Sequence, residues 1–232
     1  MKTLSLRLSL IVGCFAIAGA VPHTSSAQGV SAPVTPAFVC NQVTAMTLTR
    51  EWYEAGFEQS PGIVDDRWQL KARQSGYITE WSNPDSDFWN HPVQSPCANG
   101  STSPDRVVLT VLSWRPACCT TQAQWETQVT TAVTTLKAKY PGLKRIDLMT
   151  VVRSPGNKTC PLPPVANEYV AMPPEFDGGL AAVAAKFPGL VFFGPKIEAS
   201  SCEAFQGGGP HLTKAGNADV ARRIAEYFVK LQ

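Results

Sequence analysis

The sequence contains very little histidine and no excess of charge of either sign, and both shortages restrict what the protein can do. Of three histidines, His23 precedes the predicted mature chain, so only His91 and His211 remain as bases or metal ligands. Without Lys2 and Arg7 of the N-terminal segment, 18 basic residues face 18 acidic ones. A nonspecific nucleic-acid binder, or a protein that binds anionic membranes, needs a basic excess. We therefore expect no nucleic-acid partner and no binding to an anionic membrane surface.

Long apolar runs are also missing from most of the sequence. The exception is at the N-terminus, where an apolar stretch from Leu8 to Ala20 follows Lys2 and Arg7. This stretch is shorter than the ~20 residues of a transmembrane helix, and its flanks are typical of a secretory signal peptide. We predict a signal peptide at 1–27, a flexible leader at 28–37 and a single domain at 38–232. The protein is then secreted or periplasmic, without a transmembrane segment and monomeric. A lipid anchor at Cys14 is the weaker alternative, because the apolar run continues past it.

Cys-x-x-Cys pairs are absent, which argues against a zinc or thioredoxin-type site, and we predict no metal and no cofactor. Six cysteines follow the predicted signal peptide: Cys40, Cys97, Cys118, Cys119, Cys160 and Cys202. An even number in an exported chain indicates up to three disulfides. A bond between neighbours 118 and 119 would be strained, so we expect Cys160 to pair with Cys202, and Cys97 to pair with Cys118 or Cys119.

Short, continuous apolar runs predict strands that are buried on both faces, as in a parallel sheet covered by helices. Three such runs are clear, and two earlier segments are candidates: 107–113, 146–152 and 190–193, then 39–49 and 68–74. Helical periodicities lie between and after them, at 125–140, 180–187 and 220–231. The sequence therefore predicts an α/β fold, a three-layer sandwich with a mostly parallel, roughly five-stranded sheet. In such sheets the ligand site lies beyond the carboxyl ends of the strands.

The segment Gly207-Gly-Gly-Pro-His-Leu-Thr-Lys-Ala-Gly216 places His211 in a loop just before the last predicted helix, which Thr213 is suited to cap. A Pro-His-Leu-Thr-x-x-Gly stretch in this position resembles the final block of the SGNH, or GDSL-type, hydrolase family. The resemblance implies a flavodoxin-like fold, ester hydrolysis without a cofactor, and His211 as the catalytic base. It also places Thr47 where the family has its serine nucleophile, and Gly76 where a backbone N–H helps to form the oxyanion hole.

This sequence departs from the family at three of four hallmark side chains. Thr47 replaces the serine, Gly208 stands where an aspartate would orient the imidazole, and the loop after the third strand lacks the asparagine oxyanion donor. A backbone carbonyl or Glu203 could orient His211 instead. Ser113, at the tip of the third strand, is an alternative nucleophile or oxyanion donor. His91, next to a proline in a polar loop, is interpreted as a surface or packing residue.

All six tryptophans lie in the first half of the domain, and three of them fall in predicted loops: Trp81, Trp89 and Trp114. Tryptophan mixed with Asn and Asp is typical of carbohydrate platforms, because sugar C–H faces stack on the rings. Two functions follow from these patterns. The first is an exported ester hydrolase that acts on an acyl or acetylated-carbohydrate substrate. The alternative is a non-catalytic, extracellular carbohydrate-binding protein on the same fold, whose ligand is a small molecule or a polysaccharide.

Overall fold

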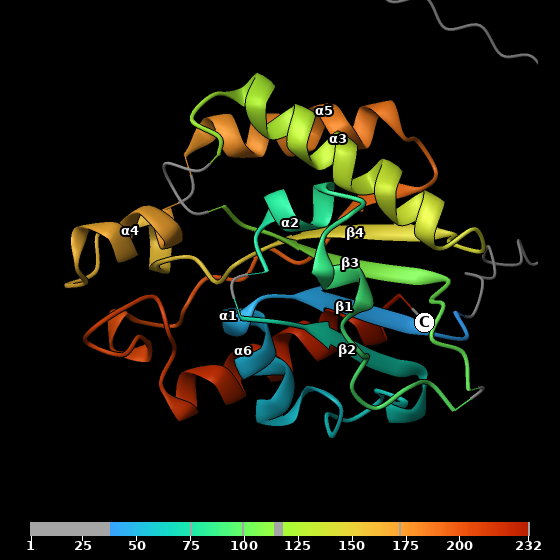
Figure 1. Cartoon of the computed structure of the whole chain (residues 1–232). Helices are drawn as coiled ribbons and strands as arrows, with labels where there is room; N and C mark the ends of the chain where they lie inside the picture. Colours follow the sequence, from blue (N-terminus) through green and yellow to red (C-terminus); the bar gives the residue numbers. More distant parts are fainter. Residues whose placement is uncertain (1–37, 75, 99, 114–117, 172, 232) are drawn as a thin grey trace, which may run out of the picture. The chain divides into compact units, whose positions relative to one another are not determined.

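The computed structural model describes residues 38–232 except 75, 99, 114–117, 172 and 232. Its centre is a five-stranded, all-parallel sheet in the order β2-β1-β3-β4-β5 (Figure 1). The strands are β1 (Asn41–Ala45), β2 (Trp68–Ala72), β3 (Arg106–Val111), β4 (Arg145–Thr150) and β5 (Val191–Phe193). The predicted α/β fold with a roughly five-stranded parallel sheet is confirmed. The predicted signal peptide, the leader and Cys14 lie outside the described residues.

Helices cover both faces of this sheet. They are α1 (Thr47–Trp52), α2 (Ile78–Ser82), α3 (Gln122–Lys139), α4 (Pro164–Ala171), α5 (Pro174–Lys186) and α6 (Lys214–Val229). Figure 1 shows α2, α3 and α5 on one face, α1 and α6 on the other, and α4 beyond one end of the sheet. A π-helical turn, η1 (Tyr53–Phe57), continues α1 and packs with α6. The domain therefore has the predicted three layers.

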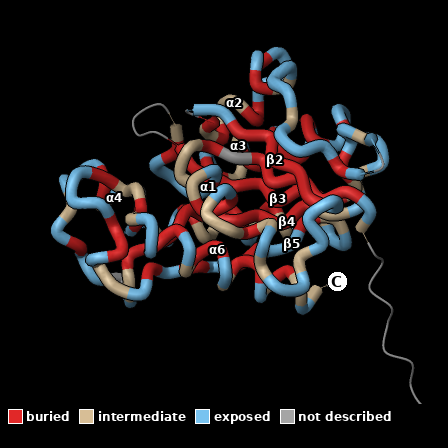
Figure 2. Tube along the Cα trace, turned by 90° about the horizontal axis from the view of Figure 1, so that it is seen from below, coloured by how far each residue is buried: buried red, intermediate tan, exposed pale blue. Residues whose placement is uncertain are grey.

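Alternate residues of the strands enter different cores, which explains their continuous apolar pattern. In β3, Val107 and Leu109 join the cluster under α3 and α5, whereas Val108 joins the cluster under α6. All three side chains are fully buried, and Figure 2 shows the strands as buried segments beneath exposed loops. Because both faces of β3 are buried, its sequence is a nearly continuous apolar run, whereas β1 and β2 also bury polar side chains such as Gln42 and Gln69 and were harder to recognise.

The predicted first strand, 39–49, is too long. β1 ends at Ala45, and the carbonyl of Met46 accepts the N–H groups of Thr49 at 3.1 Å and Arg50 at 3.0 Å, which begins α1. The sequence did not reveal the short helix α1, because the alternating apolar residues around Thr47 also fit a strand. α2 and α4 were missed for a similar reason, since helices of five and eight residues show little periodicity.

The disulfide predictions are partly right. Cys160 pairs with Cys202 as expected, but Cys97 pairs with Cys40, and the neighbours Cys118 and Cys119 pair with each other. Cys40 immediately precedes β1, and the segment after β2 returns beside that strand start. Tertiary structure thus brings Cys97 to Cys40, a proximity that no local pattern reports.

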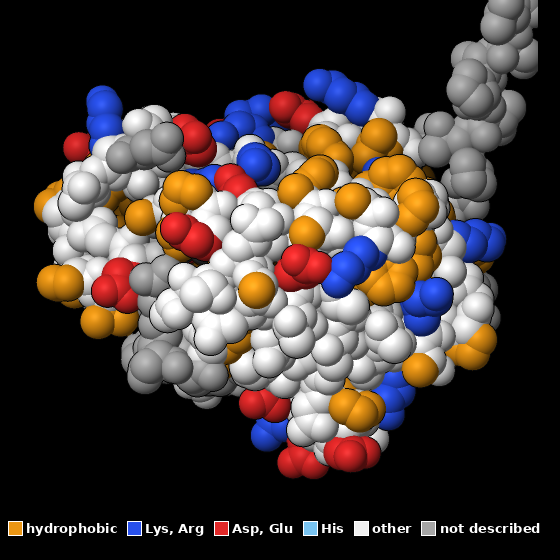
Figure 3. Space-filling view, turned by 90° about the horizontal axis from the view of Figure 1, so that it is seen from above, with side chains coloured by type: hydrophobic (Ala, Val, Ile, Leu, Met, Phe, Trp, Pro, Cys, Tyr) orange, Lys and Arg blue, Asp and Glu red, His pale blue; other side chains and the backbone are white. Residues whose placement is uncertain are grey.

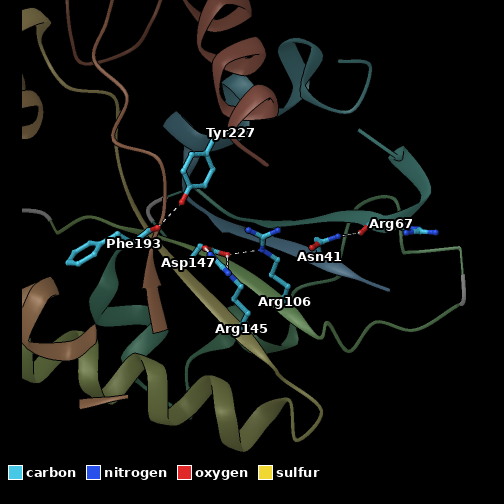
Figure 4. Close-up of polar contacts among 7 residues, drawn as sticks. All are labelled: Asn41, Arg67, Arg106, Arg145, Asp147, Phe193 and Tyr227. Atoms are coloured by element: carbon cyan, nitrogen blue, oxygen red, sulfur yellow. Dashed lines mark hydrogen bonds and ion pairs between the residues drawn. The ribbon is translucent and has the colours of Figure 1, made fainter. Parts of the chain in front are cut away.

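A buried ion cluster joins the amino ends of β3 and β4 (Figure 4). The Nε atom of Arg106 lies 2.7 Å from Oδ2 of Asp147, and Nε of Arg145 lies 2.9 Å from Oδ1 of the same carboxylate. The side chains of Arg106 and Asp147 are 1% and 0% exposed. The Arg106 guanidinium also lies 4.6 Å from the ring centroid of Phe228 on α6. The cluster therefore ties α6 to the sheet at the end opposite to the strand carboxyl ends.

The outer surface carries charges of both signs. On the face covered by α3 and α5, Lys and Arg side chains are interspersed with Asp and Glu (Figure 3). Within the part of the chain that the structure describes, none of the helices is long and apolar enough to cross a membrane.

Candidate active site

Thr47 and His211 line one cavity at the carboxyl ends of the strands. Its volume is about 360 Å³, and we call it the His211 cavity. Its lining residues are Met46, Thr47, Leu48, Gln74, Tyr77, Pro163, Val165, Ala166, Gly208, Gly209, Pro210 and His211. Thr47 lies two residues beyond the end of β1. The chain leaves β1 toward β2 and leaves β3 toward β4, in opposite directions, and such a switch point is where ligands bind in open α/β sheets.

The loop that carries His211 is held by hydrogen bonds on both sides. The N–H of Gln206 donates to the carbonyl of His211 at 2.7 Å, and the side-chain amide of Gln206 donates to the carbonyl of Leu212 at 2.8 Å. Thr213 caps α6, as predicted, by accepting the N–H of Gly216 at 3.1 Å. A Cβ at Gly216 would lie 2.6 Å from the Ala204 carbonyl oxygen, so glycine is needed for this close approach. The motif therefore fixes the backbone position of His211.

Glu51 of α1 orients the imidazole. Its Oε1 atom lies 2.6 Å from Nδ1 of His211, and the two side chains are 28% and 43% exposed. A carboxylate at this distance accepts a hydrogen bond from the Nδ1–H of the neutral imidazole, which leaves the Nε2 lone pair available as a base. Within the described residues, Nε2 has no hydrogen-bond partner. Glu51 thus brings to the imidazole a carboxylate that Gly208 lacks.

The acid and the proposed nucleophile come from the same helix. Thr47 and Glu51 are four residues apart in α1, and residues at this spacing lie on one helix face. Glu51 does not line the His211 cavity but a second, smaller hollow on the other side of Pro210. His211 therefore contacts the carboxylate away from the cavity and borders the cavity that Thr47 also lines. No hydrogen bond joins Thr47 and His211 directly in the described part of the structure.

Two other predicted reaction-site residues, Gly76 and Ser113, are not among the residues that line this cavity. Gly76 is buried, and in sequence it lies between two lining residues, Gln74 and Tyr77. Ser113 is 5% exposed, and its hydroxyl donates to the carbonyl of Cys118 at 3.5 Å. The structure brings Thr47, and not Ser113, to the same cavity as His211.

The predicted tryptophan platform is not formed by Trp81. Trp81 lies within α2, not in a loop, is 1% exposed, and donates its indole N–H to the carbonyl of Gly76 at 3.1 Å. Trp89 is half-buried in a 3₁₀ turn and packs edge-on against Trp81, with ring centroids 5.3 Å apart. Trp114 falls outside the described residues. Neither described tryptophan lines the His211 cavity.

His91 is exposed and takes no part in this site. Its backbone carbonyl accepts a hydrogen bond of 2.6 Å from Nζ of Lys71, a lysine whose pKa is lowered by burial. Glu203 was one of the groups expected to orient His211, but the carboxylate that contacts the imidazole is that of Glu51. Across the described residues, no three His, Cys, Asp or Glu side chains gather in a way that could hold a metal ion.

Sequence reasoning missed Glu51, whose carboxylate contacts the imidazole of His211. Glu51 follows Thr47 by four residues, and this spacing would have placed the two side chains near each other only if the segment had been recognised as a helix. Because 39–49 was interpreted as a strand, Glu51 fell just beyond the expected element. Its contact with His211 spans 160 positions in sequence.

Comparison with known proteins adds little. The sequence matches no family model, and no curated protein is similar to it. Among solved structures, a family two carbohydrate esterase from Clostridium thermocellum, in complex with cellohexaose, has a similar fold with a TM-score of 0.46 and 9% sequence identity. The alignment covers 83% of this chain and 63% of that esterase. This is a distant likeness of fold.

Proposed function

We propose that the protein is an exported ester hydrolase in which His211 is the general base and Thr47 is the nucleophile. The observation that supports it is the Glu51–His211 contact of 2.6 Å beside a cavity that both His211 and Thr47 line. Acyl transfer requires an oriented imidazole and a hydroxyl that face one substrate site, and His211 and Thr47 line one cavity. Glu51 is the positioning residue, since it acts on the imidazole and does not line the cavity.

The reaction follows from these roles. The Thr47 hydroxyl attacks the ester carbonyl while Nε2 of His211 takes its proton, and Glu51 stabilises the imidazolium that forms. The tetrahedral intermediate then collapses, and His211 gives the proton to the leaving alkoxide, so that an alcohol departs and an acyl-threonine remains. Water, activated by the same imidazole, hydrolyses the acyl-threonine and restores the free enzyme. The donor that the sequence suggests for the developing oxyanion is the backbone N–H of Gly76, which would have to turn toward the cavity from between the lining residues Gln74 and Tyr77.

We expect turnover to be slow. A β-branched carbon bearing the hydroxyl crowds the attacking oxygen. The loop after β3 also lacks an asparagine, and losing one oxyanion donor lowers turnover by roughly 10²–10³ in a serine protease. The acid that orients the imidazole is present, however, so the larger loss of about 10⁴ seen without it does not apply.

The test is hydrolysis of p-nitrophenyl acetate and butyrate by the purified protein, together with labelling by a fluorophosphonate followed by mass spectrometry. We expect turnover above the uncatalysed rate and a label on Thr47. Thr47→Val, which keeps the side-chain shape, and His211→Ala should both abolish turnover. His91→Ala is the matched control, because His91 is exposed and outside the cavity. Equal rates in wild type, Thr47→Val and His211→Ala would exclude the proposal.

The second candidate, a non-catalytic carbohydrate-binding protein, has less support. It depended on exposed tryptophans beside the crevice, and Trp81 is 1% exposed. Trp89 keeps part of its ring accessible, with its indole N–H bonded to the Asn83 carbonyl at 2.7 Å. Glycan binding that Trp89→Ala abolishes, in a protein without ester turnover, would favour this candidate over the hydrolase.

A further inference from the structure

One wall of the His211 cavity is a short helix with an unusually placed apolar residue. Val165, near the start of α4, is 50% exposed and is one of few large apolar side chains at the described surface. Its neighbour Ala166 is 4% exposed, and both residues line the cavity. Because Val165 is exposed and also lines the cavity, its side chain is accessible to a ligand that enters the cavity.

The α4 wall is anchored to the domain and also to the His211 loop. Val170, one turn beyond Ala166, is buried in the core under α6. The side-chain amide of Asn167 donates to the carbonyls of Cys160 at 3.1 Å and Leu162 at 2.8 Å, which fixes the turn before the helix. The Cys160–Cys202 disulfide then joins this turn to the segment that leads into the His211 loop. The two sides of the cavity are therefore linked covalently.

The chemistry of the lining favours an uncharged, aliphatic group. Its apolar members are Met46, Leu48, Tyr77, Pro163, Val165, Ala166 and Pro210. The polar side-chain groups are the amide of Gln74, the hydroxyls of Thr47 and Tyr77, and the imidazole of His211, and no charged side chain is among the described lining residues. A sugar would bring many hydroxyls that need polar partners, and this lining has few to offer.

From these observations we infer that the His211 cavity binds the aliphatic acyl chain of an ester, and that Val165 and Ala166 of α4 are its specificity determinants. The inference rests on the proposed function, because it assumes that the ester carbonyl lies between Thr47 and His211. A cavity of about 360 Å³ accommodates a chain of several carbons. Between the two substrate classes that the sequence left open, it selects an acyl ester with a chain longer than acetyl over an acetylated carbohydrate.

Binding of simple amides tests the cavity independently of catalysis. Acetamide, butanamide, hexanamide and octanamide are uncharged and lack an ester, so their dissociation constants can be measured by ligand-observed NMR with the intact protein. We expect affinity to rise about fourfold for each methylene that enters the cavity, the gain typical of a buried CH₂. Val165→Asp should remove most of this increase, and Val165→Thr, which has nearly the same shape, should remove part of it.

The matched control is Val64→Asp, because Val64 is also exposed, at 40%, but does not line the cavity. It should leave the chain-length dependence unchanged. Amide binding without ester turnover would exclude the proposed hydrolase while supporting the acyl-chain cavity. Turnover of acetyl esters with no gain in amide affinity from acetamide to octanamide, or an unaltered gain in Val165→Asp, would overturn the inference while leaving the hydrolase in place.

Discussion

The Oε1 atom of Glu51 lies 2.6 Å from Nδ1 of His211, so an acid on the first helix of the domain orients a histidine that precedes the last helix. Glu51 also lies four residues after Thr47 in α1, the spacing at which two residues share a helix face. The contact with His211 separates the two functions of the imidazole, since Nδ1 contacts the carboxylate and Nε2 remains free to take a proton. The predictions below begin with this pair.

Glu51→Gln should lower kcat by about 10²–10⁴ and leave KM nearly unchanged. The amide cannot stabilise the imidazolium and allows the wrong tautomer, as in the corresponding protease variant. KM should hold because Glu51 does not line the cavity. Steady-state kinetics with p-nitrophenyl butyrate, repeated over pH 5–9, separates this positioning role from a structural one. A change in KM with an unaltered kcat would contradict it.

Thr47→Ser should raise kcat severalfold. Removing the β-branch relieves crowding at the attacking oxygen and leaves the hydroxyl in place at the start of α1. Pre-steady-state measurements should then show a faster release of p-nitrophenol in the first turnover. If serine lowers the rate as much as valine does, the hydroxyl of residue 47 is not the nucleophile.

Two disulfides of similar loop length should have equal effects on stability but different effects on activity. Cys160–Cys202 and Cys40–Cys97 span 42 and 57 residues, and loss of each should lower the free energy of unfolding by roughly 4 kcal/mol. Only the first connects the cavity wall to the His211 loop. Replacing both cysteines of that pair by serine should therefore raise KM for butyrate esters, whereas the second double variant should lower only the melting temperature.

Asp147→Asn should destabilise the fold without affecting the site. The substitution leaves Arg106, which is 1% exposed, without its charged partner, and a buried charge left in this way typically costs about 3–5 kcal/mol. The ion cluster lies at the amino ends of the strands, opposite to the cavity. Urea denaturation should show a lower midpoint, with kcat and KM unchanged in native buffer. A midpoint equal to wild type would show that the cluster contributes little to stability.

Asp177→Asn should reduce stability at neutral pH but not in acid. Burial by itself would raise the pKa of Asp177, but Arg153 at 2.6 Å and Lys196 at 3.3 Å outweigh it and hold the pKa below its usual 3.8. A carboxyl group with a lowered pKa in the folded state stabilises the protein above its unfolded pKa, and the effect disappears as pH falls through the folded pKa. The difference in melting temperature between wild type and variant should therefore be constant from pH 7 to about pH 5 and shrink below about pH 4.

The sequence by itself determined the class of fold and the segment that carries His211. Apolar runs buried on both faces are visible locally, as in Val107 and Val108 of β3, because successive residues of a strand point to opposite faces. The Pro210-His211-Leu212-Thr213 block also reports its own structure, since a helix cap and a glycine at Gly216 are local features. The disulfides Cys160–Cys202 and Cys40–Cys97 span 42 and 57 residues, so neither pairing is a local feature of the sequence.

Only the tertiary structure decided how the site is assembled. Glu51 contacts His211 because α1 and the loop before α6 meet at the carboxyl ends of the strands, which is a property of the strand order and not of any short segment. Short α1 and α4 lack enough periodicity to be recognised, yet they carry Glu51 and Val165. Burial is likewise set by packing, so the sequence could name Trp81 as a ligand platform while the fold encloses it in the core.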